Sequence, residues 1–244
     1  MTKPFLILQL RPEAEASDDE YAAFLRFGGL AASDTHRIRL ERDDLPDLDV
    51  TDYAGVIVGG GPGCVSDAPE DKTELDARAE AACLSLMPQI TEMDHPFMGC
   101  CYGIGILAHH LGAEVSKAQY GEPVSAVTCT QTAHGEVDAM LQGLPQQFDA
   151  FVGHKEAVQH LPDGAVQLLS GDTCPFQMIR YKSNVYATQF HPEADGHGFA
   201  TRIRIYKDKG YFPPEDAQAL TDMVHSADVT APPAILRNFV ERYR

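Results

Sequence analysis

The segment "PFMGCCYGIGILAHHLG", Pro96 to Gly112, decides the fold because two kinds of secondary structure meet within it. Its first residues are a short apolar run that indicates a buried strand, and "YGIGILAHHL" indicates a helix. Cys101 lies at the junction, with Gly99 two residues before it and Gly103 two residues after it. This G-x-C-x-G pattern is the thiol counterpart of the sharp strand-to-helix turn that carries a nucleophilic serine. We therefore expect a strand–turn–helix unit with a reactive Cys101 at the turn.

The neighbouring cysteine is expected to behave differently. Cys100 has Met98 and Tyr102 at the positions where such a turn needs small residues. Because side chains alternate in direction along a strand, Cys100 should turn into the core and pack as a small hydrophobe. At a helix N-terminus, the macrodipole and the free N–H groups favour the thiolate of Cys101, which is the reactive form. Redox sensing by the adjacent cysteines is an alternative, although adjacent cysteines form strained disulfides.

Strands and helices alternate on both sides of this unit. "FLILQL" (Phe5–Leu10) and "VIV" (Val56–Val58) are continuous apolar runs, which are typical of parallel strands covered on both faces. "SDDEYAAFLRFGGL" predicts a helix with Ser17 as its N-cap and Glu20 completing a capping box. These segments indicate an α/β fold with a mostly parallel sheet between layers of helices.

The second half of the chain has a different pattern of predicted secondary structure. From about residue 113 to 189, short β-rich segments separated by turns predict added antiparallel strands, and helical segments follow. No internal repeat or linker interrupts the sequence. We expect a single domain over residues 1–244, with a catalytic core at about 5–193 and a helical C-terminal extension at about 197–244.

Composition excludes several classes of partner. The chain has 244 residues, of which 44% are hydrophobic and 23% charged, and its formal net charge is −17. Such a charge repels phosphate backbones and anionic membranes, so we expect neither nucleic acid nor membrane as a partner. The six cysteines include no C-x-x-C pair, and the first apolar run is too short for a signal peptide or membrane span. A reducing cytoplasm is the expected compartment.

Two further motifs carry chemistry. In "TQFHPEADG", His191 and Glu193 are two residues apart, so in an extended segment both side chains lie on one face. The carboxylate can then accept one imidazole N–H while the other ring nitrogen faces a thiol, although a surface turn has the same sequence. The glycines of "VIVGGGPGCVSD" free the backbone to present N–H groups to a ligand. No Lys-Ser/Thr follows as in a P-loop, which leaves an oxyanion hole as another use.

Taken in order, the three motifs resemble the class I glutamine amidotransferases, and among them the amidotransferase portion of GMP synthases. That family's GGPG loop, P-x-x-G-x-C-x-G-x-Q segment and Q-F-H-P-E segment appear here as "GGGPG", "PFMGCCYGIG" and "QFHPE". The resemblance runs from about Phe5 to Glu193. It implies a flavodoxin-like three-layer sandwich and a catalytic triad of Cys101, His191 and Glu193. It also implies an oxyanion hole formed by the backbone N–H groups of Gly60 or Gly61 and of Tyr102.

The sequence departs from the family pattern in its candidate substrate-binding residues, Gly105, Gly153 and His154. Gly105 replaces the family's glutamine, which weakens glutamine binding by roughly 1–3 kcal/mol if its partners stay unpaired, or makes room for another γ-glutamyl substrate. In "VGHKEAV", His154 matches the family's S-H-x-D-x-V segment, but Gly153 replaces serine and Glu156 replaces aspartate.

The resemblance implies hydrolysis of a γ-glutamyl amide through a thioester, with glutamine as the first choice of substrate and glutamate and ammonia as products. Neither a metal nor an organic cofactor is expected, and the remaining histidines do not suggest a ligand set. No ATP-binding signature follows Glu193, so a separate synthetase subunit would receive the ammonia, or the enzyme simply hydrolyses its substrate. Two alternatives stay open: a γ-glutamyl peptidase with the same triad, and a regulatory pseudo-amidotransferase without activity.

Overall fold

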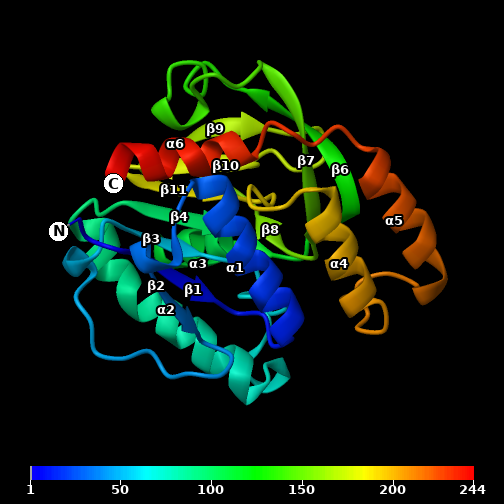
Figure 1. Cartoon of the computed structure of the whole chain (residues 1–244), viewed down its shortest axis with the longest axis horizontal. Helices are drawn as coiled ribbons and strands as arrows, with labels where there is room; N and C mark the ends of the chain where they lie inside the picture. Colours follow the sequence, from blue (N-terminus) through cyan, green and yellow to red (C-terminus); the bar gives the residue numbers. More distant parts are fainter. Residues whose placement is uncertain (1) are drawn as a thin grey trace.

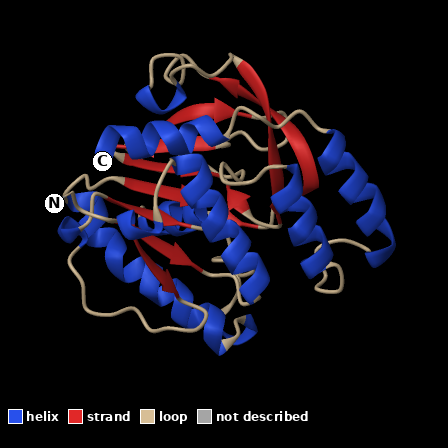
Figure 2. Ribbon diagram, in the orientation of Figure 1, coloured by secondary structure: helices blue, strands red, loops and turns tan. Residues whose placement is uncertain are grey.

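A large twisted sheet runs through the molecule, and helices cover both of its faces (Figures 1 and 2). The computed structural model describes residues 2–244. Its strands are β1 (Phe5–Gln9), β2 (Thr35–Arg39), β3 (Gly55–Val58), β4 (Phe97–Cys100), β5 (Val115–Ser116), β6 (Glu122–Gln131), β7 (Gln147–His154), β8 (Ala157–Val158), β9 (Ala165–Ser170), β10 (Met178–Tyr181) and β11 (Val185–Thr188). Its α-helices are α1 (Ala14–Gly28), α2 (Glu74–Glu92), α3 (Tyr102–His110), α4 (Gly196–Tyr206), α5 (Ala217–Ser226) and α6 (Pro233–Tyr243).

The order of the strands in the main sheet is β2-β1-β3-β4-β11-β10-β9-β6-β7. The first five strands are parallel, and their order is the flavodoxin-like 2-1-3-4-5 with β11 in the fifth place. The other four strands are antiparallel to their neighbours. The predicted α/β class with a mostly parallel sheet and added antiparallel strands is therefore confirmed. Strands β3, β4 and β11 lie side by side, so the three motifs that follow them meet at one edge of the sheet.

The two faces of the sheet have separate hydrophobic cores. Leu6 and Leu8 of β1 belong to the core under α2 and α3, whereas Phe5 and Ile7 belong to the core under α1 and α6. Burial on both faces explains why these strands are continuous apolar runs. Helix α6 lies beside α1 on the same face of the sheet (Figure 1). The centre of its Phe239 ring is 6.1 Å from the centre of the Phe5 ring. Helix α6 thus completes the core on this face, whereas α4 and α5 pack in a third, smaller cluster. No helix within residues 2–244 has the length and apolar character needed to span a membrane.

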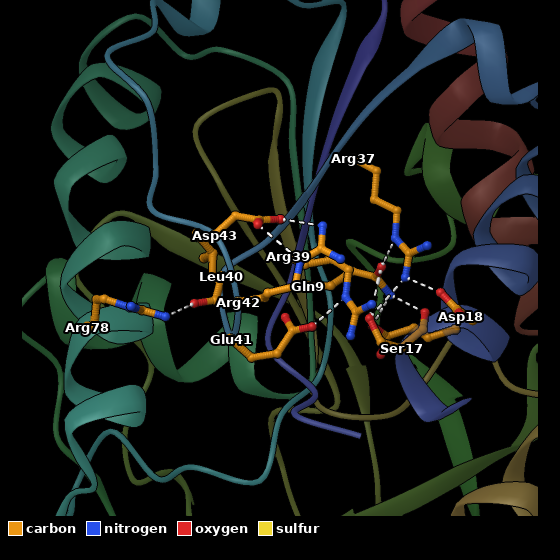
Figure 3. A network of polar contacts seen from close by, with 11 residues as sticks. Gln9, Ser17, Asp18, Arg37, Arg39, Leu40, Glu41, Arg42, Asp43 and Arg78 are labelled. Atoms are coloured by element: carbon orange, nitrogen blue, oxygen red, sulfur yellow. Dashed lines mark hydrogen bonds and ion pairs between the residues drawn. The ribbon is translucent and has the colours of Figure 1, made fainter. Parts of the chain in front are cut away.

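Helix α1 begins at Ala14, so the prediction that Ser17 is its N-cap was wrong. Ser17 and Glu20 are buried and face the sheet, where the amide of Gln9 donates to the carbonyl oxygen of Ser17 at 2.7 Å and to Glu20 Oε2 at 2.9 Å. Figure 3 shows Arg37 of β2 reaching Gln9 and Ser17 as well. The spacing of a capping box is also that of two residues on one helix face, which explains the error.

Candidate active site

The turn between β4 and α3 holds Cys101 in a backbone conformation that few side chains adopt, with φ 54° and ψ −92°. The turn is tight enough to require glycine, because a Cβ atom on Gly99 would lie 2.7 Å from the carbonyl carbon of Gly103. The Cys101 N–H donates to the carbonyl oxygen of Thr188 on β11 at 2.8 Å. Strained residues of this kind cost about 1–3 kcal/mol each and cluster at functional sites.

The two adjacent cysteines point in different directions, as expected. Cys100 is fully buried in the core beneath α1 and α6, and burial raises the pKa of its thiol well above the usual value. Cys101 is partly exposed and lines a cavity. Both thiols are free, so the prediction that Cys100 packs as a small hydrophobe is confirmed.

His191 follows β11 and is held by a buried carboxylate. Its Nδ1–H donates to Glu193 Oε1 at 2.8 Å, because an ionised carboxylate only accepts. The same oxygen lies 3.0 Å from Nη1 of Arg202, on α4. Burial alone would raise the pKa of Glu193, but His191 and Arg202 hold it well below its usual range. Glu193 therefore stays ionised and fixes the histidine tautomer, leaving the lone pair on Nε2.

Cys101 and His191, ninety positions apart in the sequence, line one cavity together with Arg202; we call it the His191 cavity. They meet because β4 and β11 are neighbouring parallel strands and each residue follows the carboxyl end of its strand. Within residues 2–244, no hydrogen bond joins the thiol to the imidazole ring. Sequence reasoning missed Arg202, since the two arginines of "FATRIRIY", Arg202 and Arg204, match no motif.

The surroundings of the thiol oppose the effect expected from the helix N-terminus. Desolvation raises the pKa of Cys101 to about 12, although Arg11 and Arg202 act in the opposite direction. Removal of the thiol from water therefore favours its neutral form, whereas the helix N-terminus favours the thiolate. Burial also lowers the pKa of His191, so its imidazole is neutral and able to take a proton.

The glycine-rich loop after β3 offers one free N–H group beside the cysteine. The Gly60 N–H donates to Glu20 Oε1 at 3.3 Å, so it is already engaged. Gly61 lines the His191 cavity with Cys101. Within residues 2–244, the N–H groups of Gly61 and Tyr102 make no hydrogen bond. Of the two glycines considered for an oxyanion hole, only Gly61 has its donor available.

A second cavity, which we call the Glu156 cavity, adjoins Cys101 and is also lined by Gly153 and His154. The His154 ring is fully engaged: Nδ1 donates to the carbonyl oxygen of Glu156 at 2.8 Å, and Nε2 lies 2.9 Å from Glu122 Oε2. His154 therefore shapes the wall rather than offering a ring nitrogen to a ligand. No sequence motif indicated that Cys174 lies beside this pair, with ligand-type atoms of Glu122, His154 and Cys174 within 4.8 Å of one another.

Gly105 does not enlarge either cavity. A Cβ atom at this position would lie 3.3 Å from both Glu156 Oε1 and Val65 Cγ2, and Gly105 is not among the residues that line the two cavities. The Glu156 carboxylate accepts the N–H groups of Val65 and Ser66, each at 2.8 Å. The expectation of extra room was wrong because Glu156, one methylene longer than the family's aspartate, occupies the space beside Gly105.

Comparison with known proteins agrees with the fold. A solved structure of a glutamine amidotransferase from Thermotoga maritima superposes with a TM-score of 0.77 at 18% identity, covering 100% of this chain and 99% of that one. The family model of glutamine amidotransferase class-I matches residues 31–204. The chain therefore belongs to the class I glutamine amidotransferase family.

The curated relatives that match this chain include GMP synthases. The glutamine-hydrolyzing GMP synthase of Thermosipho melanesiensis is 31% identical over 152 residues, which are 61% of this chain and 26% of that protein. One subunit of the glutamine-hydrolyzing GMP synthase of Thermoplasma acidophilum is 32% identical over 154 residues, which are 63% of this chain and 70% of that relative. The match thus spans about a quarter of the Thermosipho enzyme and most of the Thermoplasma protein.

Proposed function

We propose that this protein hydrolyses a γ-glutamyl amide, with glutamine as the parent substrate, through a thioester on Cys101. The observation that carries the proposal is the placement of a strained cysteine and a carboxylate-bound imidazole on one cavity. Nucleophile, base and orienting carboxylate together are the arrangement that activates a thiol. Membership of the family supports the same chemistry.

In the first half of the reaction, His191 Nε2 takes the proton of the neutral Cys101 thiol as sulfur attacks the γ-carbonyl carbon. The carbonyl oxygen becomes an oxyanion and accepts hydrogen bonds from the N–H groups of Gly61 and Tyr102. The imidazolium, stabilised by Glu193, then gives its proton to the amide nitrogen, and the C–N bond breaks. In the second half, His191 removes a proton from water as the water attacks the thioester carbonyl carbon. The C–S bond then breaks, glutamate leaves, and the imidazolium returns the proton to the Cys101 sulfur.

This sequence of steps assigns the two cavities to the two halves of the substrate. The leaving nitrogen receives its proton from His191, so the amine half faces the His191 cavity. The glutamyl half occupies the adjoining Glu156 cavity, which Cys101 and Gly153 also line. When the substrate is glutamine, the product is ammonia, and we propose a separate synthetase polypeptide as its acceptor, by analogy with the Thermoplasma relative, which is named as one subunit of its enzyme.

The two adjacent cysteines provide a matched test. Purified protein is given glutamine and a panel of γ-glutamyl amides, and released glutamate and amine are measured. We expect Cys101→Ala to lower kcat at least about 1,000-fold, because loss of a nucleophile removes the covalent route. Cys100→Ala should change kcat less than about threefold and act mainly on stability, since Cys100 is buried away from the cavity. Equal activity of Cys101→Ala and the wild type, or no turnover of any of these substrates, would overturn the proposal.

A further inference from the structure

The His191 cavity contains two buried arginines that the reaction steps above do not use. Arg11 follows β1 and Arg202 belongs to α4, and each is only 5% exposed. Arginine is rarely buried to this degree unless its charge and its N–H groups have partners. The partners of each guanidinium therefore indicate what the cavity is built to bind.

Arg11 is anchored by Glu20, and the free end of its guanidinium lies near His191. Its Nε donates to Glu20 Oε1 at 2.8 Å, and Glu20 is itself fixed by Gln9. A Cβ atom on Gly60 would lie 2.7 Å from both Arg11 Nη2 and His191 Cε1. The far end of the guanidinium and the imidazole ring therefore both lie next to Gly60.

Arg202 lacks hydrogen bonds altogether within residues 2–244. Its Nη1 forms an ion pair with Glu193, but Nε, Nη1 and Nη2 are all buried without a hydrogen-bond acceptor. The hydroxyl of Tyr206, one turn further along α4, lines the same cavity; it is buried close to Arg11 and Glu13 and makes no hydrogen bond of normal geometry within residues 2–244. Unsatisfied buried donors are costly, and such a group in a native structure calls for an acceptor that is supplied from elsewhere.

The rest of the cavity wall is apolar and aromatic, formed by Phe199, Ile203, Tyr211 and Phe212 among others. A small number of convergent polar groups in an apolar cavity is typical of a small-molecule site. Exclusion of water strengthens the interaction of the two guanidinium groups with an anion. Because guanidinium groups match carboxylate oxygens in geometry and charge, a carboxylate is the acceptor that fits.

We propose that Arg11, Arg202 and the Tyr206 hydroxyl bind a carboxylate carried by the amine half of the substrate. This inference rests on the proposed function, which places the leaving amine in the His191 cavity. The substrate class is then a γ-glutamyl amide of an amino acid, that is, a γ-glutamyl dipeptide with a free carboxylate. Water cleaves it to glutamate and the free amino acid by the thioester route. Ammonia, the leaving group from glutamine, offers these donors no acceptor.

The test compares γ-glutamylglycine with γ-glutamylethylamide, which have the same amide bond and differ in the carboxylate. We expect the wild-type kcat/KM to be at least tenfold higher for γ-glutamylglycine than for γ-glutamylethylamide or glutamine. Tyr206→Phe and Arg202→Gln should each reduce this preference at least threefold. Arg204→Gln, which makes the same change at an exposed arginine of α4 outside both cavities, should leave the preference unchanged. If Arg202→Gln lowers both rates equally, Arg202 acts only by positioning Glu193, and its place in the subsite is refuted.

A binding measurement separates this inference from the proposed function. Calorimetric titration of Cys101→Ala with the same two compounds measures their binding affinities in a protein that cannot form the thioester. At least tenfold tighter binding of γ-glutamylglycine supports the subsite even if the wild type turns over neither compound, an outcome that defeats the proposed function alone. Equal binding of the two compounds overturns the subsite, even if the wild type hydrolyses both and the proposed function stands.

Discussion

Replacing Cys101 with glycine is expected to give a more stable protein than replacing it with alanine. Both substitutions remove the thiol, so they differ only in whether a Cβ atom is forced to adopt the conformation at φ 54° and ψ −92°. That conformation is rare for any residue with a Cβ atom, and glycine adopts it readily. The comparison therefore isolates the backbone strain at the turn from the loss of the side chain.

The magnitude follows from two opposing contributions. Relief of the strain stabilises the glycine variant by about 1–3 kcal/mol. The greater freedom of glycine in the unfolded chain destabilises it by about 0.4–1 kcal/mol. The net difference is about 1 kcal/mol in favour of glycine, which corresponds to about 2–4 °C in Tm for a chain of this size.

The neighbouring Cys100 provides the control because it lies in β4 with an ordinary strand conformation. At this position glycine relieves no strain, so Cys100→Gly should be less stable than Cys100→Ala by about 0.5–1 kcal/mol. Urea unfolding followed by circular dichroism, together with calorimetric Tm values, measures both pairs. The reasoning is refuted if alanine is more stable than glycine at Cys101 as well as at Cys100.

Three other predictions concern the turn, the base and the substrate-side wall. Gly99→Ala should destabilise the protein by about 2–3 kcal/mol in urea unfolding and lower kcat. Gly103→Ala should cost less than about 1 kcal/mol, because its Cβ atom would lie no closer than 3.3 Å to its neighbours. Equal effects of the two substitutions would contradict the tight turn. Because His191 acts as a base only when neutral and burial lowers its pKa, kcat/KM should fall with decreasing pH around a midpoint below 6.5, and a midpoint above 7 would exclude this assignment. Gly105→Gln should lower stability by roughly 1–3 kcal/mol through collision with Glu156, and adding Glu156→Ala should recover part of that loss in thermal unfolding; strict additivity of the two changes would rule out the contact.

The amino-acid sequence by itself determined the features that depend on short-range geometry. Gly99 and Gly103, two residues on either side of Cys101, indicated the strand-to-helix turn, and at Gly99 this turn admits no Cβ atom. The different directions of the Cys100 and Cys101 side chains were therefore predictable. The i, i+2 spacing of His191 and Glu193 places them within reach of each other in any extended segment. Continuous apolar runs separated by helical segments indicated a parallel sheet, because a strand that is buried on both faces carries apolar side chains at successive positions.

Only the tertiary structure decided how the groups around the turn are solvated and paired. Glu20, which the sequence suggested as part of a helix cap, instead engages Arg11 and the Gly60 N–H. Arg202 of α4 lies 3.0 Å from Glu193 Oε1, a pairing that no sequence motif indicated. The ionisation of a thiol or imidazole depends on burial and on charges brought close from distant parts of the chain. Those through-space contacts are set by the packing of whole elements, which no local pattern of residues encodes.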